Sequence, residues 1–427
     1  MKIAIMTLFN GLDSSYSLVN VVKDQVTMLL NNNIEIKILV SEHCNLDNLE
    51  GIFADQRIEW CPITNSINGK RIRWIDYSND PVSLHDSFNE EVDIIAGSLL
   101  HHLQDTDICF LHDILFQGWH YIHNIAIRKV SNQLSDLNFI SFTHSFPLKR
   151  PKHPPVHLLG FYMPLRNTKY VYPTVSGITP LASQYNVPEG YCHVVSNSFS
   201  QIDFCTPEVV ELHKQVDLTD CKILIIYPAR LTPAKQHVGL MHLVGSIYEN
   251  VESSIKMIFC DFPSSDIKEE DYKSQIMSVA NSYGMNQKQV IFTSEYGFRT
   301  GFPRKSVIEL FSLSNLFICP SYSESFGLTV LEAASKGNYL VLNNLVPALN
   351  ELSTPLPSHL MNWPARTFAG EITPTYTNIS EYYLKNAEEI VKKMFDNPVI
   401  QSKTNARTRY SLEWIWKNQL EPLILSF

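Results

Sequence analysis

Short apolar runs alternate with amphipathic stretches along the chain. Residues 1–9 and 34–41 are apolar runs, and residues 16–32 between them carry apolar side chains at helical spacing. This order predicts a strand, a helix and a second strand, a unit that makes parallel strands with a right-handed crossover. The same alternation continues in both halves and predicts further strands over residues 92–98, 107–113, 138–145, 221–230, 255–262, 289–295, 315–321 and 338–344. We therefore expect an α/β fold with two Rossmann-like, doubly wound domains.

The length of the chain supports this division, because 427 residues exceed what one ordinary hydrophobic core can bury. The join is predicted between residues 197 and 210, where the strand-helix pattern restarts. We expect a first domain over residues 1–203, a second over 204–404 and a C-terminal segment over 405–427. That segment contains an amphipathic helix, and its two tryptophans, Trp414 and Trp416, need an apolar surface to pack against.

Composition is typical of a globular protein that remains in the cytoplasm. The formal charge of -9 gives no general attraction to nucleic acid or to acidic membranes. The eight cysteines are scattered without metal-ligand spacing, which is typical of reduced thiols. The first residues lack the apolar core of a signal peptide, and no run of eighteen apolar residues predicts a membrane span.

Chemically distinctive residues follow five of the predicted strands. In doubly wound sheets, ligands bind beyond the carboxyl ends of the strands. The residues at these ends are Gly11, His112 with Asp113, His144, Arg230 and Glu324. Two domains that face each other would bring them to one central cleft.

Two cations, Arg230 and Lys235, flank a predicted junction between a strand and a helix that contains Pro233. Two positive charges beside a helix N-terminus suit a diphosphate. The alternative is a pair of solvated surface charges, and the position directly after a strand favours the binding site.

The stretch SYSESFGLTVLEAASKG, residues 321–337, places Glu324 in a loop between a strand and a helix, and Glu332 inside the helix. A carboxylate can accept hydrogen bonds from two sugar hydroxyls. The amides of residues 326–328 at the helix start can bind phosphate or sugar oxygens. The alternative is a loop carboxylate and an exposed helix glutamate without a ligand.

This stretch resembles the E-G-F-G-L-x-x-x-E-A-x-A-x-G signature of retaining nucleotide-sugar glycosyltransferases of family four, which have the two-domain GT-B fold. Most of the second half is similar to other motifs of that family. These similar segments are YPARLTPAK (227–235), IKMIFCDFPSS (255–265), QVIFTSEYG (289–297), VLNNLVPALNEL (341–352) and the linker VVSNSFSQIDF (194–204). In the first half, only the order of strands and the loop histidine carry the resemblance. The final helix resembles the one that crosses back to the first domain in this family.

The resemblance implies a role for each matching residue. Arg230 and Lys235 would hold the diphosphate, Glu324 the donor sugar and Glu332 the ribose. His144 would contact the donor sugar, with His112 as its rival for that place. The implied catalytic residues are Glu324, His144, Arg230 and Lys235. The implied donor-binding residues are Gly11, Arg230, Lys235, Glu324, Ser325, Phe326, Gly327, Leu328 and Glu332.

The resemblance also implies a mechanism. The acceptor hydroxyl would attack the donor sugar on the face from which the diphosphate leaves, so that configuration is retained, and the diphosphate would take the proton. Electrostatic stabilisation of the leaving group would be the main catalytic contribution. We expect a UDP-sugar donor and no metal or other cofactor.

Three departures from the family pattern affect the expected site. Ser325 stands where the signature has glycine, the first loop retains only Gly11, and the turn after residues 255–261 has no glycine. Residues 298–306, with three cations, would either contact the donor or form a solvated loop, and we favour the loop. Those cations are Arg299, Arg304 and Lys305.

The acceptor is not determined by these motifs. A glycan or a lipid-linked sugar is expected, and a hydroxymethylated cytosine in DNA, as in phage enzymes of this fold, is the alternative. Two basic clusters, residues 70–74 and 147–153, with Trp74 and Tyr77 nearby, would suit a phosphate backbone or be ordinary surface charge. A nucleotide-sugar-binding protein without catalysis is a second alternative. An epimerase or a phosphorylase of the same fold fits less well, since the epimerase signature and the longer phosphorylase chain are missing.

Overall fold

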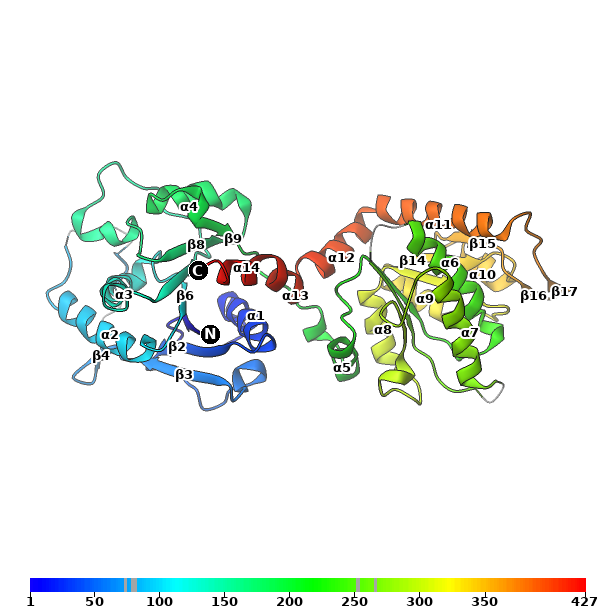
Figure 1. Ribbon diagram of the computed structural model, residues 1–427, viewed down its shortest axis with the longest axis horizontal. Helices are drawn as coiled ribbons and strands as arrows, with labels where there is room; N and C mark the ends of the chain where they lie inside the picture. Colours follow the sequence, from blue (N-terminus) through cyan, green and yellow to red (C-terminus); the bar gives the residue numbers. More distant parts are fainter. Residues whose placement is uncertain (73–74, 78–82, 251–253, 265–266) are drawn as a thin grey trace. The chain divides into compact units, whose positions relative to one another are not determined.

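The computed structural model describes residues 1–427 apart from 73–74, 78–82, 251–253 and 265–266 (Figure 1). The chain forms two compact units, one of residues 1–198 with 412–427 and one of residues 199–411. The second unit begins at residue 199, five residues before the expected start at 204. The C-terminal segment returns to the first unit at residue 412, seven residues after the expected start at 405. Trp74 and part of the 70–74 cluster lie outside the described residues.

The first unit is built on a seven-stranded sheet in the order β3-β2-β1-β6-β7-β8-β9, with every neighbouring pair parallel. Its strands are β1 Lys2–Met6, β2 Glu35–Ser41, β3 Ile58–Ile63, β6 Ile108–His112, β7 Asn138–Phe142, β8 Thr168–Tyr172 and β9 Cys192–Val194. Its helices are α1 Ser17–Asn31, α2 Phe88–Leu103, α3 Tyr121–Gln133, α4 Ile178–Tyr185, α13 Leu412–Ile415 and α14 Glu421–Ile424, with a π turn between the last two. A small antiparallel hairpin joins β4 Ser66–Ile67 to β5 Lys70–Arg71.

The second unit has a six-stranded sheet in the order β12-β11-β10-β13-β14-β15, again with parallel neighbours throughout. Its strands are β10 Ile223–Tyr227, β11 Ile255–Phe259, β12 Val290–Phe292, β13 Leu316–Cys319, β14 Tyr339–Asn343 and β15 His359–Met361. Its helices are α5 Pro207–Gln215, α6 His237–Asn250, α7 Glu269–Ser282, α8 Arg304–Leu313, α9 Leu328–Ser335, α10 Pro347–Leu352, α11 Ile379–Asp396 and α12 Pro398–Arg409. A hairpin of β16 Ala365–Thr367 and β17 Gly370–Ile372 follows β15.

The predicted two-domain α/β fold is confirmed, but the strand predicted over residues 92–98 is wrong. These residues lie inside α2, which buries Val92, Ile95 and Leu99 on one face. A short apolar run has the same appearance in a buried strand and in a buried helix. The polar first turn of α2, with Glu90 and Glu91, is the local feature that favours a helix N-terminus.

The C-terminal segment packs within the first unit. Leu412, Ile415 and Trp416 are buried in the same apolar cluster as Ile3 and Ile5 of β1, and Trp414 packs at its margin. The two tryptophans therefore find the apolar surface that their amphipathic pattern requires.

Candidate functional site

The loops after β10 and β13 are joined to each other in the second unit. The backbone N–H of Tyr322 donates to the carbonyl of Ala234 at 2.9 Å. The side chain of Gln236 donates to the carbonyl of Pro320 at 2.6 Å, and the Tyr227 hydroxyl donates to the carbonyl of Lys235 at 2.7 Å. Because β10 and β13 are neighbours in the sheet, these bonds fix both loops at its carboxyl edge.

Lys235 and Glu324 form an ion pair across these two loops. Lys235 Nζ lies 2.5 Å from Glu324 Oε1, and the side chains are 31% and 19% exposed. The sequence predicted separate roles for these residues, in binding phosphate and sugar. The structure shows that they are in contact, so that a diphosphate at Lys235 and a sugar at Glu324 would be neighbours.

The start of α9 offers backbone donors beside this pair. Within the part of the chain that the structure describes, the amides of residues 325–328 donate to no other residue. Gly327 has φ of 91°, in the left-handed region, and a Cβ there would lie 3.1 Å from Leu349 Cδ2. Ser325 is not among the described residues with positive φ, so serine fits the position where the family signature has glycine.

Glu332 lies on α9 and is held by Arg304, the first residue of α8. The Nε and Nη2 atoms of Arg304 donate to Glu332 Oε1 at 3.0 and 2.6 Å. The arginine side chain is 73% exposed and the glutamate 12% exposed. The interpretation of residues 298–306 as a solvated loop is therefore wrong for residues 304–306, which begin a helix. Arg304 contacts Glu332, the residue predicted to bind the ribose.

Two other predicted groups lie near these pairs. Arg230 is exposed three residues after the end of β10, and its contact with a diphosphate stays a prediction. The side chains of Phe326 and Leu328 are 53% and 54% exposed at the start of α9, which leaves their apolar surface open to a ligand.

A buried carboxylate that the sequence did not single out lies after β11. Asp261 is fully buried, accepts hydrogen bonds from Ser294 N and Oγ at 3.0 and 2.6 Å, and lies 3.0 Å from Lys273 Nζ. Lys273, Ser294 and Arg299 line a cavity of 910 Å³ at this edge. The sequence feature that could have pointed to Asp261 is its position shortly after the end of an apolar strand.

The carboxyl edge of the first unit brings Gly11, His112 and Asp113 to one cavity of 360 Å³. His112 Nδ1 lies 2.9 Å from His144 Nε2, and the two rings are stacked with an interplanar angle of 11°. A Cβ at Gly11 would meet no atom within 4 Å, so the surrounding packing does not require glycine there. His144, which was predicted to contact the donor sugar, and His112, the alternative for that role, therefore contact each other.

Asp113 at this edge is held in a constrained geometry. It has φ of 58°, and its carboxylate accepts hydrogen bonds from the backbone N–H of His144 at 2.9 Å and from Gln117 Nε2 at 3.1 Å. Burial raises the pKa of Asp113 to about 6 and lowers the pKa of His144 to about 4. Burial also lowers the pKa of His112 well below its usual value, and His144 adds to this effect. Both histidines are therefore neutral at physiological pH.

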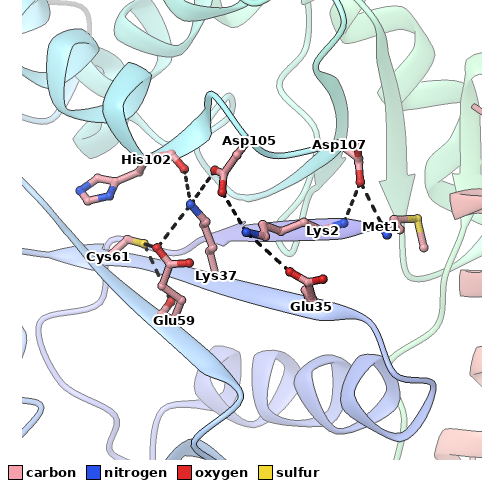
Figure 2. A network of polar contacts seen from close by, with 9 residues as sticks. All are labelled: Met1, Lys2, Glu35, Lys37, Glu59, Cys61, His102, Asp105 and Asp107. Atoms are coloured by element: carbon pink, nitrogen blue, oxygen red, sulfur yellow. Dashed lines mark hydrogen bonds and ion pairs between the residues drawn. The ribbon is translucent and has the colours of Figure 1, made fainter.

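The chain contains an Asp-x-Asp run, Asp105 to Asp107, a spacing at which two carboxylates could share a metal ion. Figure 2 shows how both are engaged in the first unit. Asp105 lies 2.8 Å from Lys2 Nζ and 2.7 Å from Lys37 Nζ, and these two bonds lower the pKa of Asp105 to about 2. Asp107 accepts from the backbone N–H of Lys2 at 2.7 Å. The run precedes β6, so it lies at the amino edge of the sheet, opposite His112.

Among the helices of the described ranges, none is both long enough and apolar enough to cross a membrane.

Comparison with known proteins identifies the second unit. Residues 209–355 match the family of glycosyl transferases group 1. The second unit belongs to this family. Both the Lys235–Glu324 pair and the Arg304–Glu332 pair lie inside the matched residues.

Curated relatives match this chain over a limited span. The serotype-specific mannosyltransferase WbdA of Escherichia coli is 29% identical over 151 residues, which is 35% of this chain. The match covers 17% of WbdA, so the chain corresponds to about a sixth of that relative. A second version of WbdA is 28% identical over the same length.

Solved structures match over the full length with low identity. Sucrose-phosphate synthase from Thermosynechococcus elongatus has a TM-score of 0.39 and 10% identity, and covers 100% of this chain and 99% of its own. Anabaena HepE, solved in complex with UDP and glucose, has a TM-score of 0.36 and 14% identity, and both chains are covered to 100%.

Proposed function

We propose that the protein transfers a sugar, with retention of configuration, from a nucleoside-diphosphate sugar to a hydroxyl of a glycan. The observation that carries the proposal is the contact between Lys235 and Glu324 beside the amides at the start of α9, which donate to no other described residue. A cation, backbone donors and a sugar-binding carboxylate at one strand edge suit a sugar diphosphate, in which phosphate and hydroxyl groups are adjacent.

In the proposed reaction, Lys235 and Arg230 bind the diphosphate, and the α9 amides add donors to its oxygens. The bond from the anomeric carbon to the diphosphate oxygen breaks, and the acceptor oxygen bonds to the same carbon on the same face. The proton of the acceptor hydroxyl passes to the departing diphosphate. Fixed cations and amides stabilise the negative charge that develops on the leaving group.

Two carboxylates position the donor in this scheme. Glu324 binds hydroxyls of the reacting sugar, and Glu332 binds the ribose. Arg304 occupies one oxygen of Glu332 and thereby directs the other toward the ribose. The proposed sugar contacts of the first unit come from neutral His144 and His112, with Gly11.

The sugar and the acceptor are proposed from the relatives. WbdA is described as a mannosyltransferase, which supports a hexosyl group and makes mannose a candidate. The descriptions of the relatives named above mention sugars, and none of them mentions DNA. We therefore propose a glycan acceptor and a UDP-sugar donor, with a nucleoside-diphosphate mannose as the first competitor.

The test is mass spectrometry of products formed from a panel of UDP-sugars and GDP-mannose with glycan, lipid-linked and hydroxymethylated-DNA acceptors. NMR of the new anomeric centre would establish retention or inversion. A product that the Lys235→Ala variant does not form supports the proposal. Nucleotide-sugar binding without product in the whole panel would favour the non-catalytic alternative, and transfer to DNA alone would refute the glycan acceptor.

A further inference from the structure

The first unit has a second hollow on a different part of its surface. A groove of 520 Å³ lies where α2, α3 and residues 156–166 meet. Figure 1 shows α2 and α3 side by side in this unit. None of the residues Gly11, His112, Asp113 and His144 lines the groove, so it is distinct from the candidate site.

Much of the groove lining is apolar and open to solvent. Ile125 of α3 and Leu159 contribute to the wall, and both are only partly buried. Val156 and Met163 also line the groove and are 84% and 46% exposed. Exposed apolar side chains that gather around a hollow are typical of a binding surface, whereas single ones need no explanation.

The groove also carries positive charge without a compensating carboxylate. None of the sixteen described residues that line it is Asp or Glu, whereas Arg128 and Arg166 are among them. Arg128 donates to Asn124 Oδ1 at 2.8 Å and to the carbonyls of Gly160, Pro164 and Met163 at 2.9, 2.9 and 2.7 Å. These acceptors are neutral, so the guanidinium keeps its net charge beside the apolar wall.

The sequence around the groove also has an excess of positive charge. Residues 137–188 contain five lysines and arginines and no acidic residue, although the whole chain has a formal charge of -9. This stretch includes the 147–153 cluster, which the sequence left open between a phosphate-binding patch and ordinary surface charge. A local positive field beside an apolar wall attracts a molecule that is anionic at one end and apolar at the other.

We propose that this groove binds a lipid with an anionic head group, with its apolar chain against Ile125, Val156 and Met163 and its head group at Arg128 and Arg166. Duplex DNA fits less well, because it would place phosphates, and no apolar surface, against the exposed valine and methionine. Free phosphate would meet the arginines and leave the apolar wall uncovered.

The test measures binding to the full chain by isothermal titration calorimetry, with dodecyl phosphate below its micellar concentration as the probe. Dodecyl maltoside, inorganic phosphate and a short DNA duplex are the comparison ligands. We expect dodecyl phosphate to bind at least about tenfold more tightly than each of them, since only it satisfies both the cation and the apolar wall. No nucleotide sugar enters the assay, so its result is independent of the proposed glycosyl transfer.

Substitutions localise the binding. Val156→Asp places a carboxylate in the groove and should weaken dodecyl phosphate binding about tenfold, and Arg166→Gln about threefold. The matched control is Val175→Asp, since Val175 is 78% exposed and does not line the groove. Equal binding of the neutral detergent, unchanged binding in Val156→Asp, or tighter binding of DNA than of dodecyl phosphate would each overturn the proposal. Circular dichroism establishes that both aspartate variants are folded.

Discussion

Replacing Arg304 tests whether the carboxylate of Glu332 binds ribose. The arginine holds Glu332 through two hydrogen bonds of 3.0 and 2.6 Å to a single oxygen. Because the arginine side chain is 73% exposed, solvent screens the pair, and its worth is at most about 1 kcal/mol. Arg304→Gln should therefore weaken binding of the free nucleoside diphosphate about two- to fivefold. The rate at saturating donor should change little, because ribose contacts are equal in the ground and transition states.

Glu332→Gln should have a larger effect in the same direction. The amide retains one acceptor oxygen and loses the charge-assisted bond, which costs about 1.5–3 kcal/mol, or at least about tenfold in affinity. In the double variant, Arg304→Gln should add little, since the carboxylate that it positions is already gone.

The assay is calorimetric titration of the four proteins with UDP and with 2′,3′-dideoxy-UDP. With the dideoxy nucleotide, which lacks the ribose hydroxyls, the four proteins should bind with equal affinity. Lys305→Gln is the matched control, because Lys305 is the exposed neighbour of Arg304 and does not line the cavity beside Asp261. Unchanged UDP affinity in Glu332→Gln, or equal losses with the dideoxy nucleotide, would refute the ribose clamp.

Four further predictions concern catalysis and stability. Lys235→Ala and Glu324→Gln should each lower the rate at saturating donor by about 10²-fold or more, and near-normal steady-state turnover would contradict their roles. Gly327→Ala should destabilise the protein by about 1–3 kcal/mol in urea unfolding, more than Gly337→Ala, since both have positive φ but only the first Cβ meets a neighbour within 4 Å. As pH falls from about 6.5 to about 4, thermal stability should fall. Burial lowers the pKa values of His120, His123 and His144 in the folded protein to about 4, 3 and 4. In this pH range the unfolded chain therefore binds more protons than the folded one, which favours unfolding. Asp113, with its pKa raised to about 6, opposes this trend, and a flat melting temperature would contradict it. Turnover should survive chelation by EDTA, and loss of activity that Mn²⁺ restores would show that a metal is required.

Local patterns predicted the elements that carry the site. The apolar run before Pro320 and the helical spacing after Gly327 correctly placed Glu324 in a loop and Glu332 on a helix. The prediction failed for residues 92–98, where an apolar run alone does not distinguish a buried strand from a buried helix. The sequence prediction was also wrong for Arg304, which begins α8 and does not lie in a solvated loop. A helix start at this position depends on the residues against which α8 packs.

The sequence by itself determined the alternation of strands and helices and the polar residues at the strand ends, because both depend on neighbouring positions along the chain. Only the tertiary structure decided which of these ends meet. Lys235 and Glu324 are 89 positions apart, and they touch because β13 pairs with β10 rather than with its predecessor β12. His112 and His144 meet at the edge of the β6–β7 pair, where β7 does lie beside its predecessor in the chain. Sheet order depends on the packing of whole helices and strands, so the contacts that it creates have no signature at either residue alone.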